Sequence, residues 1–250
     1  MATSIAERGT SPEPGTTRTT LTGIRTWSPS RFLAAAAASF IVVVALGACR
    51  DDNAPNKALV KAVNLTRADV PPEWAESPRR DPVGEDGDDS RYAACVGRPD
   101  PKNERTADAD SVEYHLEDRL RAMSSAQTQP SVEEAVADLA AQRADRGLSC
   151  LRQRFKGQLN RNSTGGDAPE SFTVQRIPDV GVGDESVAFR AELVYPSKNG
   201  NQPKAYIDVV TVRTGRAETV FTLFSAGQPF PADLARDLMT KVVARASPGT

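Results

Sequence analysis

Apolar and polar residues alternate through the last third of the chain, which is the pattern of half-buried β-strands. Over residues 187–195, apolar side chains hold every second position, and Arg190 and Glu192 stand between them. This alternation places one face of a sheet on a core and the other in solvent. The same pattern recurs over 172–177, 206–212 and 220–224. Gly215 lies between the last two runs, so we expect them to form a hairpin that turns at this glycine.

The segment that begins at Ser131 has helical spacing instead. Ser131 and Glu134 make a capping box, in which the hydroxyl accepts the amide of Glu134 and the carboxylate returns to the amide of Ser131. Apolar residues then recur at intervals of three and four: Val132, Ala135, Val136, Leu139 and Ala140. The residues on the other side are Asp138, Gln142 and Arg143. The pattern predicts a helix with its apolar stripe inward and these polar residues outward, ended or interrupted by Gly147 near Cys150.

Two further segments complete the predicted fold. From about Asp233, Leu234, Leu238 and Val242 share one helical stripe, which should close the apolar face of the sheet. Residues 112–123 have helical spacing in their first half and alternation in their second half, and we expect a strand over the second half. Together the elements predict an α+β fold, with an antiparallel sheet of about five strands packed by two or more helices.

A long uncharged and mainly apolar run, residues 32–48, follows Arg31 near the start of the chain. A positive flank, an apolar stretch and small residues before a cleavage point are the parts of a signal peptide. The run ends in Leu46-Gly47-Ala48-Cys49, which is similar to the lipobox of bacterial lipoproteins. Ala48 is the small residue before the cut, and the thiol of Cys49 is the group that such proteins link to diacylglycerol. We therefore expect lipidation at Cys49 and attachment to the outer face of the cell membrane.

Two other interpretations of this run stay open: an ordinary signal peptide and an uncleaved membrane anchor. A spanning helix needs roughly 20 apolar residues, so the run is marginal for that purpose. All three interpretations place the remaining residues outside the cytoplasmic membrane. The predicted organisation is a signal peptide with a long n-region over 1–48, a lipid-anchored linker over 49–58 and a single extracytoplasmic domain over 59–250.

The charge balance argues against a nucleic-acid partner. The chain has 31 basic and 33 acidic residues, and residues 1–49 hold four of the arginines and two of the glutamates. The remainder therefore has 27 basic and 31 acidic residues, and its basic residues form no cluster. Nucleic-acid surfaces concentrate Lys and Arg, so no such partner is expected.

The other two cysteines, Cys95 and Cys150, are expected to form a disulfide. Thiols in exported proteins generally oxidise and pair, and a bridge over this separation stabilises by roughly 4 kcal/mol in the loop-entropy model. The alternative is a pair of buried free thiols.

No catalytic motif is present. The predicted domain has one histidine, His115, and neither His-Glu-x-x-His nor Gly-x-Ser-x-Gly occurs. Paired carboxylates of the glycosidase kind remain open because Asp184, Glu185 and Asp208 lie in or beside predicted strands. The acidic run over 81–89 lacks the ligand spacing of a calcium loop and is interpreted as a solvated loop. We expect no catalysis, no cofactor and no metal site.

Several motifs together give a resemblance to known proteins. In chain order they are the predicted lipidated cysteine, Val70-Pro71-Pro72-Glu73-Trp74, Ala94-Cys95-Val96-Gly97, the capped helix, Gly181-Val182-Gly183-Asp184-Glu185-Ser186, Val212-Arg213-Thr214-Gly215-Arg216 and the closing helix. Over roughly residues 65–245 the chain resembles actinobacterial secreted lipoproteins and the extracellular sensor domain of mycobacterial receptor-type serine/threonine kinases (PknH-like). The resemblance implies an antiparallel sheet packed by helices around a cleft, stapled by disulfides, and a role in sensing or binding outside the membrane. It brings no catalytic residues, and the family's sensors typically have two disulfides where this chain can form one.

These observations predict a lipid-anchored, non-catalytic sensor or ligand-binding domain at the cell envelope. The aromatic candidates for a ligand site are Trp74, Tyr114, Tyr195, Tyr206 and Phe230, and none of them is favoured individually. The alternative is a structural or accessory envelope protein that contacts a partner through a sheet edge or the polar loop at 199–201. A carboxylate-based hydrolase is the third hypothesis.

Overall fold

The computed structural model describes residues 53–79, 88–162, 168–196 and 202–246. Over these residues the fold is α+β, with one antiparallel sheet, as predicted. The strands are β1 (Ala75–Ser77), β2 (Ala107–Asp110), β3 (Glu113–Leu116), β4 (Leu120–Thr128), β5 (Ser171–Ile177), β6 (Glu185–Val194), β7 (Lys204–Thr214) and β8 (Ala217–Ala226). The helices are α1 (Ala54–Ala62), α2 (Asp88–Val96), α3 (Pro101–Glu104), α4 (Val132–Arg143), α5 (Asp145–Asn162) and α6 (Ala232–Ala244).

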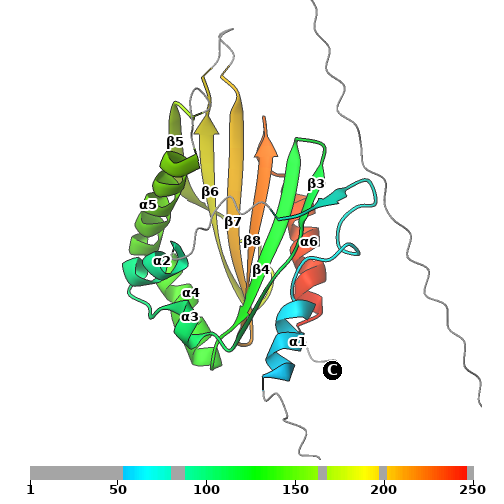
Figure 1. The fold of residues 1–250 in the computed structure, drawn as a ribbon, viewed down its shortest axis with the longest axis vertical. Coiled ribbons are helices and arrows are strands. Elements are labelled where there is room, and N and C mark those ends of the chain that lie inside the picture. Colours follow the sequence, from blue (N-terminus) through cyan, green and yellow to red (C-terminus); the bar gives the residue numbers. More distant parts are fainter. Residues whose placement is uncertain (1–52, 80–87, 163–167, 197–201, 247–250) are drawn as a thin grey trace, which may run out of the picture. The chain divides into compact units, whose positions relative to one another are not determined.

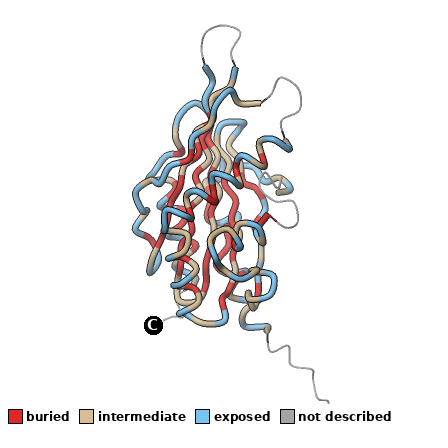
Figure 2. The backbone as a smooth tube through the Cα atoms, turned by 90° about the vertical axis from the view of Figure 1, so that its left-hand side faces the viewer, coloured by how far each residue is buried: buried red, intermediate tan, exposed pale blue. Residues whose placement is uncertain are grey.

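The sheet separates two helical layers (Figure 1). Its strand order is β1-β3-β4-β8-β7-β6-β5. Strand β2 pairs with the C-terminal part of β4, residues 125–128. Helices α2 to α5 lie against one face, and α1 and α6 lie against the other. The buried positions follow the strands, whereas the outward sides of the helices are exposed (Figure 2).

The larger core lies between the sheet, α6 and α1. Alternate residues of β7 and β8, Val210, Val212, Phe221 and Leu223, point to this side. From α6 the buried residues are Ala235, Leu238, Met239 and Val242. The predicted closing helix and the predicted hairpin, with its turn at Gly215 between β7 and β8, are both confirmed.

The sheet has eight strands over the described residues, more than the five or so expected. Three short strands account for the difference: β1, β2 and β3. Residues 113–116 have helical spacing in sequence but lie between β1 and β4 as a strand, because ladder hydrogen bonds on both sides outweigh local spacing. The strand expected over the second half of 112–123 is confirmed as the start of β4.

Helix α1 begins inside the segment predicted to be a linker. Residues 54–58 are helical, Pro55 occupies the first turn, and Val60 is buried in the larger core. A proline fits the first turn because its missing N–H has no partner there in any helix. Within the described residues, helical structure therefore includes residues 54–58, which their polar composition did not indicate.

Helix α4 is capped as predicted but rotated from the predicted orientation. Ser131 Oγ accepts the amide of Glu134 at 3.2 Å. Ala135 and Leu139 are buried, whereas Val132 and Val136 are 44% and 38% exposed. Asp138, Gln142 and Arg143 are half-buried and make polar contacts to the rest of the domain, so the prediction that they face outward is wrong. The reason is that Gln142 and Arg143 find polar partners on the sheet, the Thr211 hydroxyl and the Ser186 carbonyl oxygen.

The predicted disulfide between Cys95 and Cys150 is confirmed. It joins α2 to α5, with 5.8 Å between the Cα atoms. Cys150 belongs to α5 rather than to the end of the capped helix, because α4 ends before Ala144 and α5 begins after it. A Cβ on Gly147 would lie 2.1 Å from the carbonyl oxygen of Gln142, so the two helices can meet this closely only with glycine there. The disulfide thus fixes the outer helix α2 to the longest helix of the layer.

Candidate functional site

A cleft of about 350 Å³ lies between the sheet and the layer of α2 to α5. Its floor is the sheet face that bears Val209, Thr211, Val220 and Thr222. The same face carries Ser125 and Gln127 of β4. The floor stays open because α4 and α5 pack over β5, β6 and β7, where Val174, Val187 and Ala191 are buried. Towards β8 and β4 the floor residues Ser125, Gln127, Val220 and Thr222 are only half-buried.

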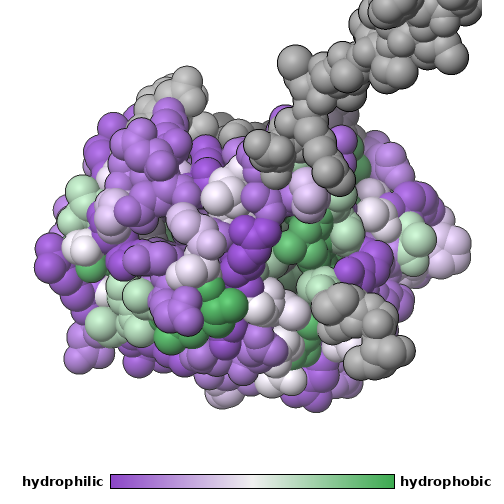
Figure 3. Space-filling model, turned by 90° about the horizontal axis from the view of Figure 1, so that it is seen from below, coloured by the Kyte–Doolittle hydropathy of each residue, from purple (hydrophilic) through white to green (hydrophobic). Residues whose placement is uncertain are grey.

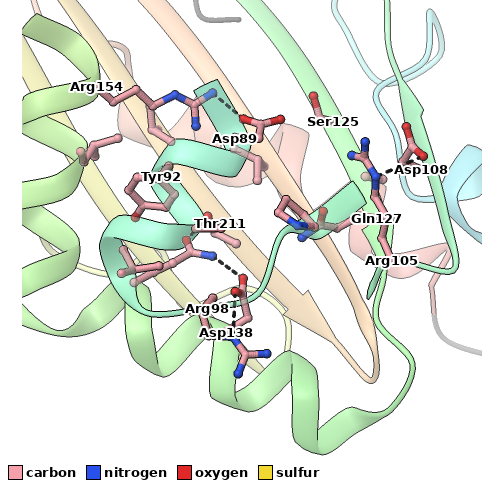
Figure 4. A pocket seen from close by; sticks show the side chains of 18 of the residues that line it. Asp89, Tyr92, Arg98, Arg105, Asp108, Ser125, Gln127, Asp138, Arg154 and Thr211 are labelled. Carbon is pink, nitrogen blue, oxygen red and sulfur yellow. Dashed lines mark hydrogen bonds and ion pairs between the residues drawn. The ribbon is translucent and has the colours of Figure 1, made fainter. Parts of the chain in front are cut away.

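Paired charges form most of the walls (Figure 4). Arg154 of α5 contacts Asp89 of α2 at 2.7 Å, and its guanidinium carbon lies 5.8 Å from the ring centre of Tyr92. On the opposite side Arg105 contacts Asp108 at 3.4 Å. The basic lining residues are Arg79, Arg98, Lys102, Arg105 and Arg154, and the acidic ones are Asp89, Glu104, Asp108, Asp110 and Asp138. Five of each sign leave the lining without a large net charge.

Aromatic side chains reach the cleft from three elements. Tyr92, Phe155 and Phe189 line it, from α2, α5 and β6. Burial, and then the nearby charge of Asp138, raise the pKa of Tyr92 to about 12, so its phenol keeps its proton at neutral pH. The aromatics named from the sequence do not line this cleft. Trp74 and Phe230 pack edge-to-face in the larger core, where Tyr114 is also buried.

A polar network occupies the end of the cleft next to α4. Gln142 Nε2 donates to Asp138 Oδ2 at 2.9 Å, and Thr211 Oγ1 donates to Gln142 Oε1 at 2.9 Å. Arg98 approaches Asp138 at 3.5 Å (Figure 4). It also donates to Glu134 at 2.6 Å. The network therefore joins α4 to the sheet and to the segment after α2.

A buried carboxyl group, Glu218, lies beneath this end of the cleft. Glu218 is fully buried, and its Oε2 accepts Gln127 Nε2 at 2.8 Å and Gln129 Nε2 at 2.9 Å. Its Oε1 has no hydrogen-bond partner among the described residues. Burial and the charge of Asp138 raise the pKa of Glu218 to about 7. No pattern in the sequence singles out this residue, because a glutamate on a hairpin strand is ordinarily solvent-exposed.

The carboxylates proposed from the sequence as a catalytic pair do not converge. Glu185 pairs with Arg213 and Arg143, whereas Asp208 accepts two bonds from Arg190 at 2.6 and 2.7 Å. Residues 185 and 190 of β6 stand opposite 213 and 208 of β7, so five strand positions, or about 17 Å, separate the two sites. Glycosidase carboxyls lie roughly 5 to 9 Å apart. Asp184 contacts Arg213 as well.

His115 lies on β3, away from the lining of the cleft. Its Nδ1 is 3.5 Å from Ser77 Oγ, which in turn donates to Glu113 Oε1 at 3.3 Å. In a catalytic triad the carboxylate orients the imidazole, whereas here it contacts the hydroxyl. This arrangement does not prepare Ser77 as a nucleophile.

Three sequence hypotheses concern residues that lie wholly or mostly outside the described ranges. Cys49 and the rest of the predicted lipobox lie outside the described residues, as does the loop at 199–201. Most of the acidic run at 81–89 is also outside them, and its last two members begin α2, where Asp88 contacts Arg91 and Arg161. The described residues contain no group of three His, Cys, Asp or Glu side chains placed to hold a metal ion. Nor do they include a helix with the length and apolar character to cross a membrane.

No family model matches the sequence, and no curated protein matches it significantly. Solved structures similar to this one include the extracellular domain of PknH from Mycobacterium tuberculosis, at 12% identity over 76% of this chain and 95% of that domain, with a TM-score of 0.44. They also include LpqN of the same organism, which is involved in cell envelope biogenesis, at 15% identity over 69% of this chain and 74% of LpqN, with a TM-score of 0.26. TM-scores below 0.5 at these identities do not establish a shared fold. Membership of the kinase-sensor family therefore stays a prediction.

Proposed function

We propose that this chain is a lipid-anchored, non-catalytic sensor domain that binds a small ligand outside the cytoplasmic membrane, in the cleft between the sheet and α2 to α5. The observation that carries the proposal is the cleft itself. Its volume of about 350 Å³ falls within the range of small-molecule sites, roughly 300 to 1,000 Å³, and polar and aromatic groups converge on it. An accessory protein without a small ligand has no need of such a cleft.

The lining favours a polar ligand of low net charge. Hydroxyl and amide groups from Ser125, Gln127, Thr211 and Thr222 offer both donors and acceptors on the floor. The balanced charges of the walls are already engaged with one another, as in Arg154 with Asp89 and Arg105 with Asp108. A multiply charged ligand would have to break these pairs without gaining a surplus of opposite charge.

Filling the cleft is expected to abolish ligand binding. Thr222→Tyr places a large side chain on the cleft floor, and Thr173→Tyr is the matched control because Thr173 is an exposed strand residue outside the lining. Residues 51–250 would be screened by native mass spectrometry and thermal shift against envelope lipids and glycans. For any ligand found, Thr222→Tyr should weaken binding by at least about ten-fold, or 1.4 kcal/mol. Equal binding by both variants would place the ligand elsewhere.

The anchor is the second part of the proposal and rests on the lipobox at residues 46–49. Cys49→Ser is expected to move the protein from the membrane fraction to the soluble fraction, because no thiol remains to carry diacylglycerol. Intact mass of the native protein should show the added diacylglyceryl group. Unchanged partition of the variant, together with a native mass that lacks this group, would exclude lipidation.

A non-catalytic role is supported by the dispersal of the candidate groups. Asp138 and Glu218 interact electrostatically, but Glu218 is sealed beneath Gln127 and Gln129. A general acid must reach its substrate within hydrogen-bond distance, and the Glu218 carboxyl has no access to the cleft.

The alternative of an accessory protein has a weaker basis. Such a protein would present a contact patch, and the exposed apolar side chains of α4 are the two valines at 132 and 136. In the view from below, hydrophobic side chains form only small patches among hydrophilic ones (Figure 3). Protein interfaces of stable complexes bury far larger areas.

A further inference from the structure

Glu218 is held to the sheet through one oxygen only. It stands opposite Gln127 in the β4–β8 ladder, and both Gln127 and Gln129 donate to its Oε2. Its Oε1 is buried and lacks a partner within the described part of the chain. An ionised carboxyl group can accept about four hydrogen bonds, so burial with two donors leaves its charged form poorly compensated.

The nearest facing charge on α4 has the same sign. Asp138 projects from α4 towards the cleft, and its charge acts on Glu218. Glu134, one turn earlier, and Glu104 of α3 add negative charge around Arg98. Ionised Glu218 and Asp138 of α4 would therefore repel each other.

The basic side chains near Glu218 form their ion pairs and hydrogen bonds with other residues. Arg98 forms ion pairs with Glu134 at 2.6 Å and with Asp138 at 3.5 Å. Arg213, opposite Glu218 on β7, contacts Asp184 and Glu185. Arg216 of the hairpin turn contacts Asn56 and the carbonyl oxygen of Gln129. None of the three makes a hydrogen bond or an ion pair with Glu218 among the interactions of the described residues, so its ionisation lacks a dedicated counter-charge.

The first half of α4 makes little apolar contact with the core and is held through Glu134, which pairs with Arg98 at 2.6 Å. Val132 and Val136 are exposed, and Ala135 contributes only a methyl group to the core. The contacts that tie α4 to the sheet are near its C-terminal end, where Gln142 meets Thr211 and Arg143 meets Glu185. Repulsion between Glu218 and Asp138 would therefore act next to the first half of α4, which lacks these contacts with the sheet.

We propose that Glu218 is a proton-controlled latch of the cleft: its protonated form keeps the first half of α4 on the sheet, and loss of the proton releases this half and widens the cleft. The latch would regulate the ligand site proposed above, and it rests on that proposal for its biological meaning.

The pH range follows from the direction of the shift. The pKa of Glu218 lies at about 7 in the closed structure, above the ordinary glutamate value. A carboxyl with a raised pKa binds more protons in the closed state, so its contribution to closure is complete below the ordinary value and is lost as pH rises through 7. At pH 8 the ratio of closed to open α4 should be about ten-fold lower than at pH 6.

Hydrogen exchange of the full-length chain in detergent, at pH 6 and pH 8 with times scaled for intrinsic exchange, tests the latch without any ligand. The protection of native α4 amides should be about ten-fold lower at pH 8 than at pH 6, whereas the protection of α6 amides should not change. Glu218→Gln should keep α4 protected at both values. Glu113→Gln, a change at another buried glutamate, is the control and should behave like the native protein.

Two further variants test the direction in which neighbouring charges shift the pH of the transition. Asp138→Asn removes the like charge and should move the transition to lower pH, whereas Arg98→Gln removes a favourable charge and should move it to higher pH. Native α4 protection that does not change with pH would overturn the proposal, and so would a Glu218→Gln variant with the native pH dependence. If Glu218→Gln does not fold, opposite shifts in the other two variants support the latch, and shifts of the same sign or none overturn it. A failed ligand screen with these results intact would count against the ligand site alone.

Discussion

Replacing Cys95 and Cys150 by alanine is expected to lower the free energy of unfolding by about 4 kcal/mol. The disulfide spans 55 residues, so its loss returns the entropy of a long loop to the unfolded chain. The buried residues of α2 are Asp88 and Ala93. Its other ties to α5 include the ion pairs of Asp88 with Arg161 and of Asp89 with Arg154. Urea unfolding of the native and double-alanine proteins, with equal slopes, measures the difference.

Reduction provides the control for this prediction. Dithiothreitol should destabilise the native protein by a similar amount and leave the double-alanine variant unchanged. A double variant within about 1 kcal/mol of the native protein would show that packing alone holds α2 on α5. The cleft would respond as well, because Tyr92 and Asp89 reach it from α2.

The last third of the fold was predictable because one strong pattern covers it. The alternation over 187–195 corresponds to β6, and the two runs around Gly215 correspond to β7 and β8. Each of these strands has a face buried against α1 and α6, so burial imposes period two on the sequence. The closing helix is equally regular, since Leu238 and Val242 occupy a single stripe.

The short strands and the orientation of α4 were not predictable in the same way. Residues 113–116 are too few for alternation to outweigh helical spacing, and their pairing with β4 is a long-range effect. In α4 the apolar valines face solvent, while Asp138 and Gln142 face a polar layer. A rule that turns apolar residues inward fails where the neighbouring surface is a cleft.

The cleft brings together residues that are far apart in sequence. Arg98 comes from the segment after α2, Asp138 from α4 and Thr211 from β7, and no local motif predicts that they lie close together. Glu218 is harder still, because its importance comes from complete burial beneath Gln127 and Gln129. The sequence therefore predicted the disulfide, which the structure confirms, whereas the candidate site depends on tertiary structure.

Asp69→Ala is expected to destabilise the domain by about 3 to 4 kcal/mol, because it leaves a partly buried arginine without its partner. Asp69 accepts Arg245 at 2.5 and 2.8 Å and also the amide and hydroxyl of Thr66. Arg245 donates further to the carbonyl oxygens of Ala62 and Asn64. The contacts of Asp69 and Arg245 therefore form a clamp that joins the end of α6 to the segment after α1. Urea unfolding at pH 7 measures the loss.

The matched control is Asp237→Ala on the same helix, where an exposed pair with Lys241 should contribute at most about 0.5 kcal/mol. Burial opposes ionisation of Asp69, but the bonds from Arg245 and Thr66 outweigh it, and its pKa is lowered. Its contribution is therefore present above the ordinary aspartate pKa and is lost as pH falls through the lowered value. Native stability should decline below about pH 4, and Asp69→Asn should flatten this decline. Equal losses for Asp69→Ala and Asp237→Ala would show that the clamp acts only as a surface ion pair.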